Sequence, residues 1–474
     1  MSEKVLKDSM DGMPERELLI KSQKAAKEFA SYTPAQVDKI VEAVAAAAFE
    51  KAQDYAEWAV RETGFGVVEH KVLKNQAASA ALVEYYRGQC FAGYEVDPKL
   101  KVVKFARPAG VVLGVTPCTN PISTIFYKVL VSLMGRNSIV FCPHPASKDC
   151  CADAADVLLA AAVKAGAPEN VVQVVREPSI PVVDAMMKSD LVNVILATGG
   201  PGLVKAAYSS GGPAVGVGPG NVAHYVDETA DISKAAADVV FSASFDNNVL
   251  CTGESVVLAK NAIADQLLAS MTEQGAYLLP SADDVAKLRG YLFPEGKMNP
   301  ESIGQSAQFI ADKAGIVVPE GTVLLCVTLK KIDENDEFSC EKMFPIVGVL
   351  RVEDTDEALT AAQEMIRFGG SGHSAAIHST DNDAILAWGS LNVCRVTVNG
   401  PAALVSAGLG AELTAGLNPT MTLGTGYFGG ASIGDNIGPM HLIEWTQLAY
   451  DGGFPADDDA AVEAALKHWD ASRG

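Results

Sequence analysis

The segment Val192-Asn193-Val194-Ile195-Leu196-Ala197-Thr198-Gly199-Gly200-Pro201-Gly202 decides the fold class of this chain. Its first six residues form a short, mainly apolar run, which is typical of a strand buried on both faces of a sheet. The glycines that follow allow a tight turn, and Pro201 suits the first position of a helix. Strand, turn and helix in this order are the repeating unit of a parallel sheet covered by helices.

The same unit recurs along the chain. Further strands are predicted at 111–115, 138–142, 171–175, 255–258, 323–327, 347–352, 374–378 and 395–398. Helices are predicted at 33–58, 69–87, 147–165 and 355–366, the first of them opened by the capping pattern Thr33-Pro34-Ala35-Gln36. A length of 474 residues is too great for one core. We therefore predict an α/β fold with two domains and a site in the cleft between them.

The composition limits the classes of protein that fit. A formal net charge of −21 argues against a nucleic-acid partner, since both molecules would be polyanions. No apolar run reaches the roughly 18 residues that a membrane span needs. The charged N-terminal segment lacks the apolar stretch of a signal peptide, so we expect a cytoplasmic protein. Nine cysteines without a CxxC pair predict neither a disulfide framework nor a metal site.

Cys251 lies at the junction between two differently patterned halves, within the segment 244–254. A nucleophile is expected there, because a nucleotide held by one half would meet a substrate held by the other. The competing interpretation is a small buried filler, which is the usual role of a free cysteine. Asn120 follows a predicted strand, and its amide either donates to an oxyanion or holds the turn.

Three glycine- or proline-rich corners predict a nucleotide site. Thr198, Gly199 and Gly200 precede a helix whose free amide groups favour phosphate, although a tight turn explains the same residues. Pro143-His144-Pro145 follows a strand on the same edge and can shape an adenosine pocket. Gly218 lies in the glycine-dense segment 215–221, which indicates either a ligand contact or a bulged turn.

Together these segments resemble the aldehyde dehydrogenase superfamily, and within it the CoA-acylating branch. The resemblance covers roughly residues 15–450 and is closest to the first half of bifunctional aldehyde–alcohol dehydrogenases and to stand-alone acylating enzymes. It is carried by the segments 116–121, 141–145, 196–202, 216–221, 245–251, 372–374, 422–426 and 438–439.

The resemblance implies two Rossmann-type parallel-sheet domains and a small oligomerisation element. A nucleotide-binding domain is expected at 1–245, with an oligomerisation strand near 100–110, and a catalytic domain at 246–425. The segment 426–474 is expected to return to the first domain and to end in an oligomerisation tail. We therefore expect a homodimer or homotetramer.

The resemblance also implies roles for single residues. Cys251 is the expected nucleophile, and Asn120 with the Cys251 amide forms the expected oxyanion hole. The residues expected to bind NAD or NADP are His144, Pro145, Thr198, Gly199, Gly200, Gly218 and Glu341, the last at the nicotinamide ribose. The candidates for the substrate or CoA pocket are His373, which a structural role explains equally well, and Thr425. Amide dipoles near Cys251 are expected to favour its thiolate, and no metal is expected.

The glycine segment indicates which molecule accepts the acyl group. Hydrolytic members of the superfamily use a glutamate in a Glu-Leu-Gly-Gly-Lys motif to activate water, but the matching stretch 216–220 has no carboxylate. Water, with a pKa near 15.7, needs such a base. A thiol, with a pKa of about 8.5, is already partly ionised at neutral pH. We therefore expect a thioester on Cys251 to pass its acyl group reversibly to coenzyme A.

Several alternatives stay open in the sequence. A hydrolytic aldehyde dehydrogenase with another base is one alternative function, and a non-catalytic nucleotide-binding scaffold is the other. Acetaldehyde and sulfoacetaldehyde are both candidate substrates. Arg395 and His441 are candidate cations for a sulfonate, with structural roles as the competing interpretation. Lys148 offers a positive charge to the 2′-phosphate of NADP, so the choice between NAD and NADP also stays open.

Overall fold

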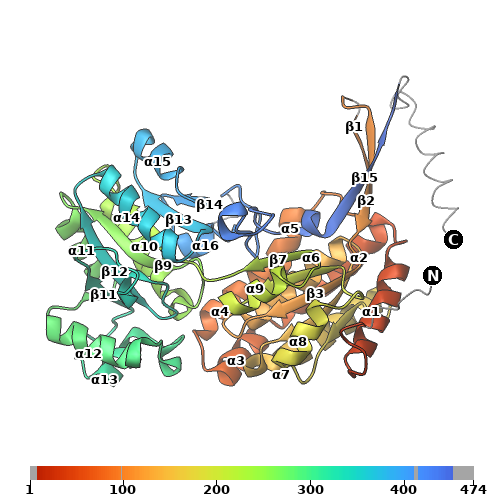
Figure 1. Ribbon diagram of the computed structural model, residues 1–474, viewed down its shortest axis with the longest axis horizontal. Helices are drawn as coiled ribbons and strands as arrows, with labels where there is room; N and C mark the ends of the chain where they lie inside the picture. The colour runs from red at the N-terminus through yellow and green to blue at the C-terminus, as the bar shows by residue number, and fades with distance from the viewer. Residues whose placement is uncertain (1–7, 98, 410–414, 452–474) are drawn as a thin grey trace, which may run out of the picture.

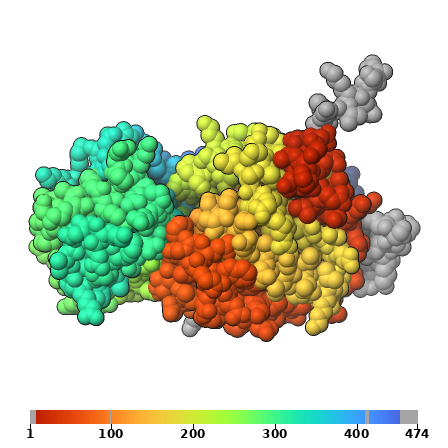
Figure 2. Space-filling view, turned by 90° about the horizontal axis from the view of Figure 1, so that it is seen from below, coloured from red at the N-terminus to blue at the C-terminus, as the bar shows by residue number. Residues whose placement is uncertain are grey.

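The computed structural model of the protein describes residues 8–97, 99–409 and 415–451. Two parallel sheets form the cores of two lobes, and a small antiparallel sheet projects from one of them (Figure 1). Figure 2 shows the lobes as two masses that meet along a seam. No helix among the described residues combines the length and the apolar character needed to cross a bilayer.

The first sheet has the strand order β5-β4-β3-β6-β7, and all its neighbouring strands are parallel. Its strands are β3 (Val111–Thr116), β4 (Ser138–Pro143), β5 (Val172–Val174), β6 (Val194–Thr198) and β7 (Ala214–Val217). The helices between them are α6 (Pro121–Met134), α7 (Lys148–Ala165), α8 (Ile180–Met187) and α9 (Pro201–Tyr208). Apolar side chains extend from both faces of the sheet, and helices cover both faces. The predicted parallel arrangement is confirmed.

The N-terminal helices pack on this first sheet. They are α1 (Arg16–Phe29), α2 (Pro34–Glu50), α3 (Ala52–Thr63), α4 (Val68–Gln76) and α5 (Leu82–Tyr86). The predicted capping box is present: the Gln36 amide donates to Thr33 Oγ1, and the Thr33 amide donates to the Gln36 side chain. The prediction of one helix over 33–58 is wrong, because Lys51 leaves the helical conformation and separates α2 from α3. The helix predicted at 69–87 is present but contains a π-turn, η1 (Ala77–Ala81).

The second sheet has the strand order β10-β11-β12-β9-β8-β13-β14 and is also parallel throughout. Its strands are β8 (Val222–Val226), β9 (Glu254–Lys260), β10 (Ala276–Leu278), β11 (Leu324–Thr328), β12 (Ile346–Val352), β13 (Gly372–His378) and β14 (Val393–Val398). Its helices are α10 (Ile232–Ser244), α11 (Ala264–Glu273), α12 (Ala282–Leu292), α13 (Ala307–Ala314), α14 (Thr355–Phe368), α15 (Asn382–Trp388) and α16 (Ala402–Val405).

The chain changes sheets between β7 and β8, not at residue 245 as the sequence suggested. β8 lies inside the second sheet between β9 and β13, and α10 packs its apolar face on that sheet. A strand followed by a helix looks the same in either sheet, so the local pattern cannot show which sheet the strand joins. The segment 218–221, which joins β7 to β8, is therefore the crossing between the lobes.

The small sheet consists of β1 (Gly93–Asp97), β2 (Val102–Pro108) and β15 (Ile443–Ala449), in the order β1-β2-β15. β15 pairs antiparallel with β2, and Leu442 and Ile443 join the core of the first lobe. The chain thus returns to the first lobe after leaving the second (Figure 1). The part of the expected oligomerisation tail from residue 452 onward lies outside the described residues.

Candidate active site

A cavity of about 570 Å³ lies at the carboxyl ends of the first sheet's strands. Val249, Cys251, Glu341 and Met343 of the second lobe close its other side. The predicted catalytic and cofactor-binding residues all line it: Asn120, His144, Pro145, Thr198, Gly199, Gly200, Gly218, Cys251 and Glu341. Strand ends of a parallel sheet are the usual place for a ligand, so the corners predicted from sequence converge on one space.

A strained turn delivers Cys251 to this cavity. After α10 the chain enters η3 (Phe245–Asn248), where Asp246, Asn247 and Asn248 have φ angles of 53°, 54° and 58°. Three successive left-handed residues are costly, but Asp and Asn tolerate this conformation better than other side chains. Side-chain amides of the turn stabilise it through bonds to neighbouring segments. Asn247 Nδ2 donates to Gly304 O at 2.8 Å, and Asn248 Nδ2 donates to Phe344 O at 3.2 Å.

The crossing segment between the sheets packs directly on the Cys251 loop. A Cβ atom placed on Gly220 would lie 2.0 Å from Cys251 O, closer than any side chain can approach. At Gly218, by contrast, an added Cβ would meet nothing within 4 Å, and this residue faces the cavity. The glycines of the segment therefore have different roles: one permits backbone contact and the other leaves space for a ligand.

The Cys251 amide lowers the pKa of its thiol, which is the direction expected from the sequence, but burial has the larger effect. Burial, together with the smaller effect of the Glu341 carboxylate, raises the pKa of Cys251 to about 12. The Arg395 guanidinium and the Cys251 backbone amide lower the pKa, but by less than burial raises it. Desolvation of the sulfur therefore outweighs the amide dipoles.

Glu341 brings a carboxyl group to the cavity that the glycine segment lacks. Its Oε1 accepts a hydrogen bond of 2.8 Å from the Gly220 amide, and burial raises its pKa to about 8. Most of this carboxyl is therefore protonated at neutral pH. The sequence placed Glu341 at a nucleotide ribose, and the structure adds that it is close enough to Cys251 to affect the pKa of the thiol.

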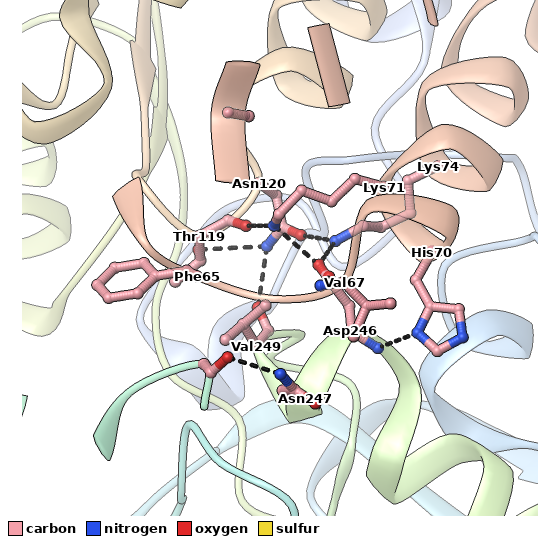
Figure 3. A network of polar contacts seen from close by, with 12 residues as sticks. Phe65, Val67, His70, Lys71, Lys74, Thr119, Asn120, Asp246, Asn247 and Val249 are labelled. Carbon is pink, nitrogen blue, oxygen red and sulfur yellow. Dashed lines mark hydrogen bonds and ion pairs between the residues drawn. The ribbon is translucent and has the colours of Figure 1, made fainter. Parts of the chain in front are cut away.

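Asn120 forms the N-terminal boundary of α6 and lies next to Val249 of the nucleophile loop (Figure 3). Its Nδ2 donates to Val249 O at 3.0 Å and to Thr119 Oγ1 at 3.2 Å, and its Oδ1 accepts from Lys74 Nζ. The two residues predicted to bind an oxyanion, Asn120 and Cys251, are thus brought to the same cavity.

The other end of the cavity has room for a phosphate. A Cβ atom on Gly200 or Gly202 would meet nothing within 4 Å, and both glycines lie at the start of α9. Thr198 Oγ1 accepts from the buried Lys128 Nζ at 3.2 Å, which fixes the end of β6. Burial lowers the pKa of His144, so its imidazole is neutral at neutral pH. An apolar cavity that ends at a helix N-terminus fits a dinucleotide.

The candidates for a substrate or CoA pocket do not line this cavity. His373 is buried beside the crossing segment, with Nδ1 at 2.8 Å from Ser374 Oγ, and burial together with Arg395 lowers its pKa to about 3. Thr425 is buried against Gly372, where an added Cβ would lie 1.9 Å from Thr425 O. Both residues therefore pack behind the site, and their predicted roles stay predictions.

Three further charged candidates already have protein partners. The Arg395 guanidinium donates to the carbonyls of His373, Gly424 and Gly434. His441 Nδ1 accepts from the Gly438 amide at 3.0 Å. Lys148 Nζ lies 2.9 Å from the Glu177 carboxylate. Arg395 and His441 thus have the structural contacts that the sequence left as the competing interpretation.

Sequence analysis missed the buried charges around Asn120, namely Lys71, Lys74 and Asp246, and the half-buried His70 beside them (Figure 3). Lys71 and Lys74 are three residues apart on a helix. This spacing is as common for lysines on a solvent-exposed helix face as for buried ones. Only Asp246 lies in a segment that the sequence singled out, the one that leads to Cys251. Nothing local to the lysines indicates a partner 172 residues further along the chain.

The fold and the site define an α/β protein whose two parallel sheets share one cavity, with a cysteine at one end and a nucleotide-type corner at the other. Residues 16–410 match the aldehyde dehydrogenase family. AdhE, the bifunctional aldehyde-alcohol dehydrogenase of Escherichia coli (strain K12), is 39% identical over 438 residues, which are 91% of this chain and 49% of that protein. The succinate-semialdehyde dehydrogenase (acetylating) of Clostridium kluyveri is 38% identical over 437 residues, covering 92% of this chain and 95% of that protein.

A solved structure agrees with these matches. The crystal structure of an acetylating aldehyde dehydrogenase from Geobacillus thermoglucosidasius has 36% sequence identity and a TM-score of 0.90, and the match covers 94% of this chain and 99% of that one. The chain belongs to the aldehyde dehydrogenase family. It spans about half the length of the bifunctional relatives that it matches. Among the described residues, no group of three or more His, Cys, Asp or Glu side chains is arranged to hold a metal ion.

Proposed function

We propose that the protein is a CoA-acylating aldehyde dehydrogenase, which converts an aldehyde, CoA and NAD(P)+ to an acyl-CoA and NAD(P)H. The observation that carries the proposal is the single cavity that joins Cys251 and Asn120 to the open glycine corner at α9. Two of the matched relatives are named as acetylating enzymes, which supports the same activity.

In this scheme the Cys251 thiol releases its proton to solvent water, and Sγ forms a bond to the aldehyde carbon as the carbonyl π bond breaks. The carbonyl oxygen becomes an oxyanion, which takes hydrogen bonds from Asn120 Nδ2 and from the Cys251 amide. Since Nδ2 now donates to Val249 O and Thr119 Oγ1, one of these bonds must be exchanged for the oxyanion. A bound nicotinamide supplies the hydride acceptor, and a thioester on Cys251 results. The CoA thiol then attacks that carbonyl carbon, and the Cys251 sulfur leaves.

Glu341 supports a second candidate, the hydrolytic dehydrogenase, because it places a carboxyl group at the cavity. A carboxyl group with a pKa of about 8 is mostly protonated at pH 7 and is then a poor base for water. We therefore favour CoA as acceptor and retain ribose binding as the proposed role of Glu341. The test is turnover with and without CoA. The proposal expects acyl-CoA as product and little free acid without CoA, and free acid formed at the full rate without CoA would overturn it.

The residues that line the cavity also indicate which aldehyde is the substrate. Its described lining contains neither Lys nor Arg, and Arg395 is occupied by backbone carbonyls. A sulfonate needs a cation or several donors, so acetaldehyde is favoured over sulfoacetaldehyde. A panel of uncharged and anionic short aldehydes tests this choice. NAD and NADP are compared in the same assay, because the pairing of Lys148 with Glu177 reduces the attraction that Lys148 offers to a 2′-phosphate.

We propose that the small sheet joins protomers in a homo-oligomer. The sheet projects from the first lobe, and β1 and β15 are its two edges (Figure 1). Tyr94, Val96 and Leu448 expose 37–44% of their surfaces on these edge strands. Unpaired edge strands with exposed apolar side chains favour association with another strand or copy. Light scattering tests this: a monomer at micromolar concentration would rule out the role assigned to the small sheet.

A further inference from the structure

A cluster of buried charges lies against the Asn120 amide (Figure 3). It comprises Lys71, Lys74 and Asp246, whose side chains are no more than 4% exposed. The lysines come from α4 in the first lobe, whereas Asp246 comes from the strained turn η3 in the second. The cluster therefore joins the lobes at the point where the proposed oxyanion site and the nucleophile loop meet.

The Asp246 carboxylate accepts hydrogen bonds from three donors in the segment 67–74. Its Oδ1 accepts from the Val67 amide at 2.7 Å, at the start of α4. Its Oδ2 accepts from Lys71 Nζ at 2.9 Å and also from Lys74 Nζ. A Cβ on Gly66 would lie 2.1 Å from Oδ1, so only glycine fits there. Asp246 thus fixes both ammonium groups and the beginning of the helix that carries them.

The two lysines hold different parts of the neighbouring loop. Lys71 Nζ donates to the backbone carbonyl of Thr119 at 2.9 Å. Lys74 Nζ donates instead to the side chain of Asn120, at Oδ1. The loop is therefore anchored twice, and only Lys74 contacts the amide that is proposed to bind the oxyanion.

The contact with Lys74 decides which way the Asn120 amide faces. An ammonium group can only donate, so the amide must present its oxygen to Lys74. Its nitrogen then faces Val249 O, at 3.0 Å, on the side of the nucleophile loop. An amide turned by half a rotation would place its own N–H groups against the ammonium and lose the bond. Shape alone does not prevent that rotation, because the two ends of the amide have nearly the same size.

We propose that Lys74, held by Asp246, is a positioning residue that keeps the Asn120 nitrogen facing the proposed oxyanion. The inference rests on the proposed function, since the oxyanion forms only if Cys251 attacks a carbonyl. Without the ammonium, the Asp246 carboxylate is an acceptor left beside the amide. The Asn120 nitrogen then turns toward this carboxylate and away from the reacting oxygen.

The charges around Lys74 agree with this role. Burial lowers its pKa to about 8 and Lys71 lowers it as well, whereas the Asp246 carboxylate raises it. The ammonium form therefore still dominates at pH 7. His70 also faces the cluster, and burial lowers its pKa, so its imidazole is neutral at that pH. A positive charge behind the amide also strengthens the hydrogen bond that its nitrogen gives to an oxyanion.

The test compares two reactions of the same sulfur in the Lys74→Met variant. Acyl transfer from acetyl-CoA to Cys251 passes through an oxyanion, whereas alkylation by iodoacetamide does not. We expect acyl transfer, and kcat with aldehyde and CoA, to fall about 10- to 100-fold, as on loss of an oxyanion donor. We expect KM for the aldehyde to stay within roughly threefold and alkylation within about twofold. Mass spectrometry of the Cys251 peptide follows both modifications.

Lys71→Met is the matched control, because it removes the same charge from the same carboxylate without touching the Asn120 side chain. We expect a similar loss of stability and a clearly smaller loss of acyl transfer. A second check introduces Lys74→Met into the Asn120→Ala variant. If Lys74 acts through the amide, the further loss of kcat in that background is no more than about twofold.

Three results would overturn the proposal. Equal losses of acyl transfer and alkylation in Lys74→Met would mean that Lys74 holds the nucleophile loop rather than the amide. If the fold-losses of kcat from the two single substitutions multiply in the double variant, Lys74 and Asn120 act independently. A crystal structure of Lys74→Met in which Asn120 Nδ2 still donates to Val249 O, rather than to Asp246, would refute the positioning role of Lys74. A wild-type protein that turns over no aldehyde with CoA and NAD(P)+ would instead refute the proposed function, and the crystal structure decides the positioning in that case too.

Discussion

Replacing Gly220 by alanine tests whether the crossing between the lobes sets the position of the nucleophile. A Cβ at residue 220 would lie 2.0 Å from Cys251 O and 2.9 Å from His373 Nδ1. Contacts of this kind are essentially never shorter than 3.0 Å, so the Cys251 carbonyl or the crossing segment must move by about 1 Å. The Gly220 amide also holds Glu341, so the carboxyl group would move with it.

The size of the effect follows from that displacement. A misplacement of about 1 Å between reacting groups costs roughly 100-fold in rate. Overpacking of this kind costs about 1 to 3 kcal/mol in the free energy of unfolding. We therefore expect a folded Gly220→Ala variant whose kcat is reduced about 100-fold, followed by nicotinamide absorbance in the presence of aldehyde and CoA. Urea unfolding measures the accompanying loss of stability.

Gly212→Ala is the control for this substitution. An added Cβ at residue 212 has only Ser210 Oγ within 4 Å, at 3.9 Å, which is an ordinary contact. This variant is expected to keep the wild-type kcat. A Gly220→Ala variant with wild-type kcat would show that the nucleophile tolerates the displacement, and the reasoning from the close approach would fail.

Three further predictions concern the remaining groups of the site. Cys251→Ala is expected to lose turnover and the acyl adduct detected by mass spectrometry, and normal turnover would exclude Cys251 as the nucleophile. Glu341→Gln is expected to gain stability relative to wild type as the pH rises from 5 to 9. Burial raises the pKa of Glu341 from 4.5 to about 8, so the folded wild type loses stability as the pH rises through this window, by about 4 kcal/mol between pH 5 and pH 9, while glutamine stays neutral. A difference in urea unfolding that does not change with pH would contradict this assignment. Lys128→Met is expected to lower the free energy of unfolding by about 2 to 4 kcal/mol, because the buried carbonyls of Val115 and Leu196 lose their shared hydrogen-bond donor. Urea unfolding that matches wild type would contradict it.

The parallel sheets could be predicted because their strands are buried on both faces. Runs such as 111–115 and 194–198 are then almost entirely apolar, and the helices between them have recognisable caps and glycines. The break at Lys51 and the π-turn at 77–81 carry no such pattern, because packing against neighbouring helices decides them. The sheet that β8 joins could not be predicted either, since local sequence does not encode the order of strands.

The residues of the cavity could be predicted where they end a strand, as Thr198 does, or follow one, as Asn120 and His144 do. Their side chains meet because the strand ends of a parallel sheet share one edge. The effect of the amide on the Cys251 pKa could be predicted, but the larger opposing effect of burial could not, because it depends on how the lobes pack around the sulfur. His373 lies near Cys251 in space but behind the crossing segment, and nothing in its own segment distinguishes these two positions.

Two of the contacts that define the site run between the lobes. The Asn120 amide of the first lobe donates to Val249 O of the second, and Lys74 of α4 binds Asp246 of the turn that precedes Cys251. Within the second lobe alone, the Cys251 loop would lack the Asn120 amide. Within the first lobe alone, the buried ammonium groups of α4 would lack the carboxylate that balances them, which is costly. The charges at the seam therefore have two effects: they stabilise the docking of the lobes, and they allow the nucleophile and its amide partner to lie on one cavity only when the lobes are docked.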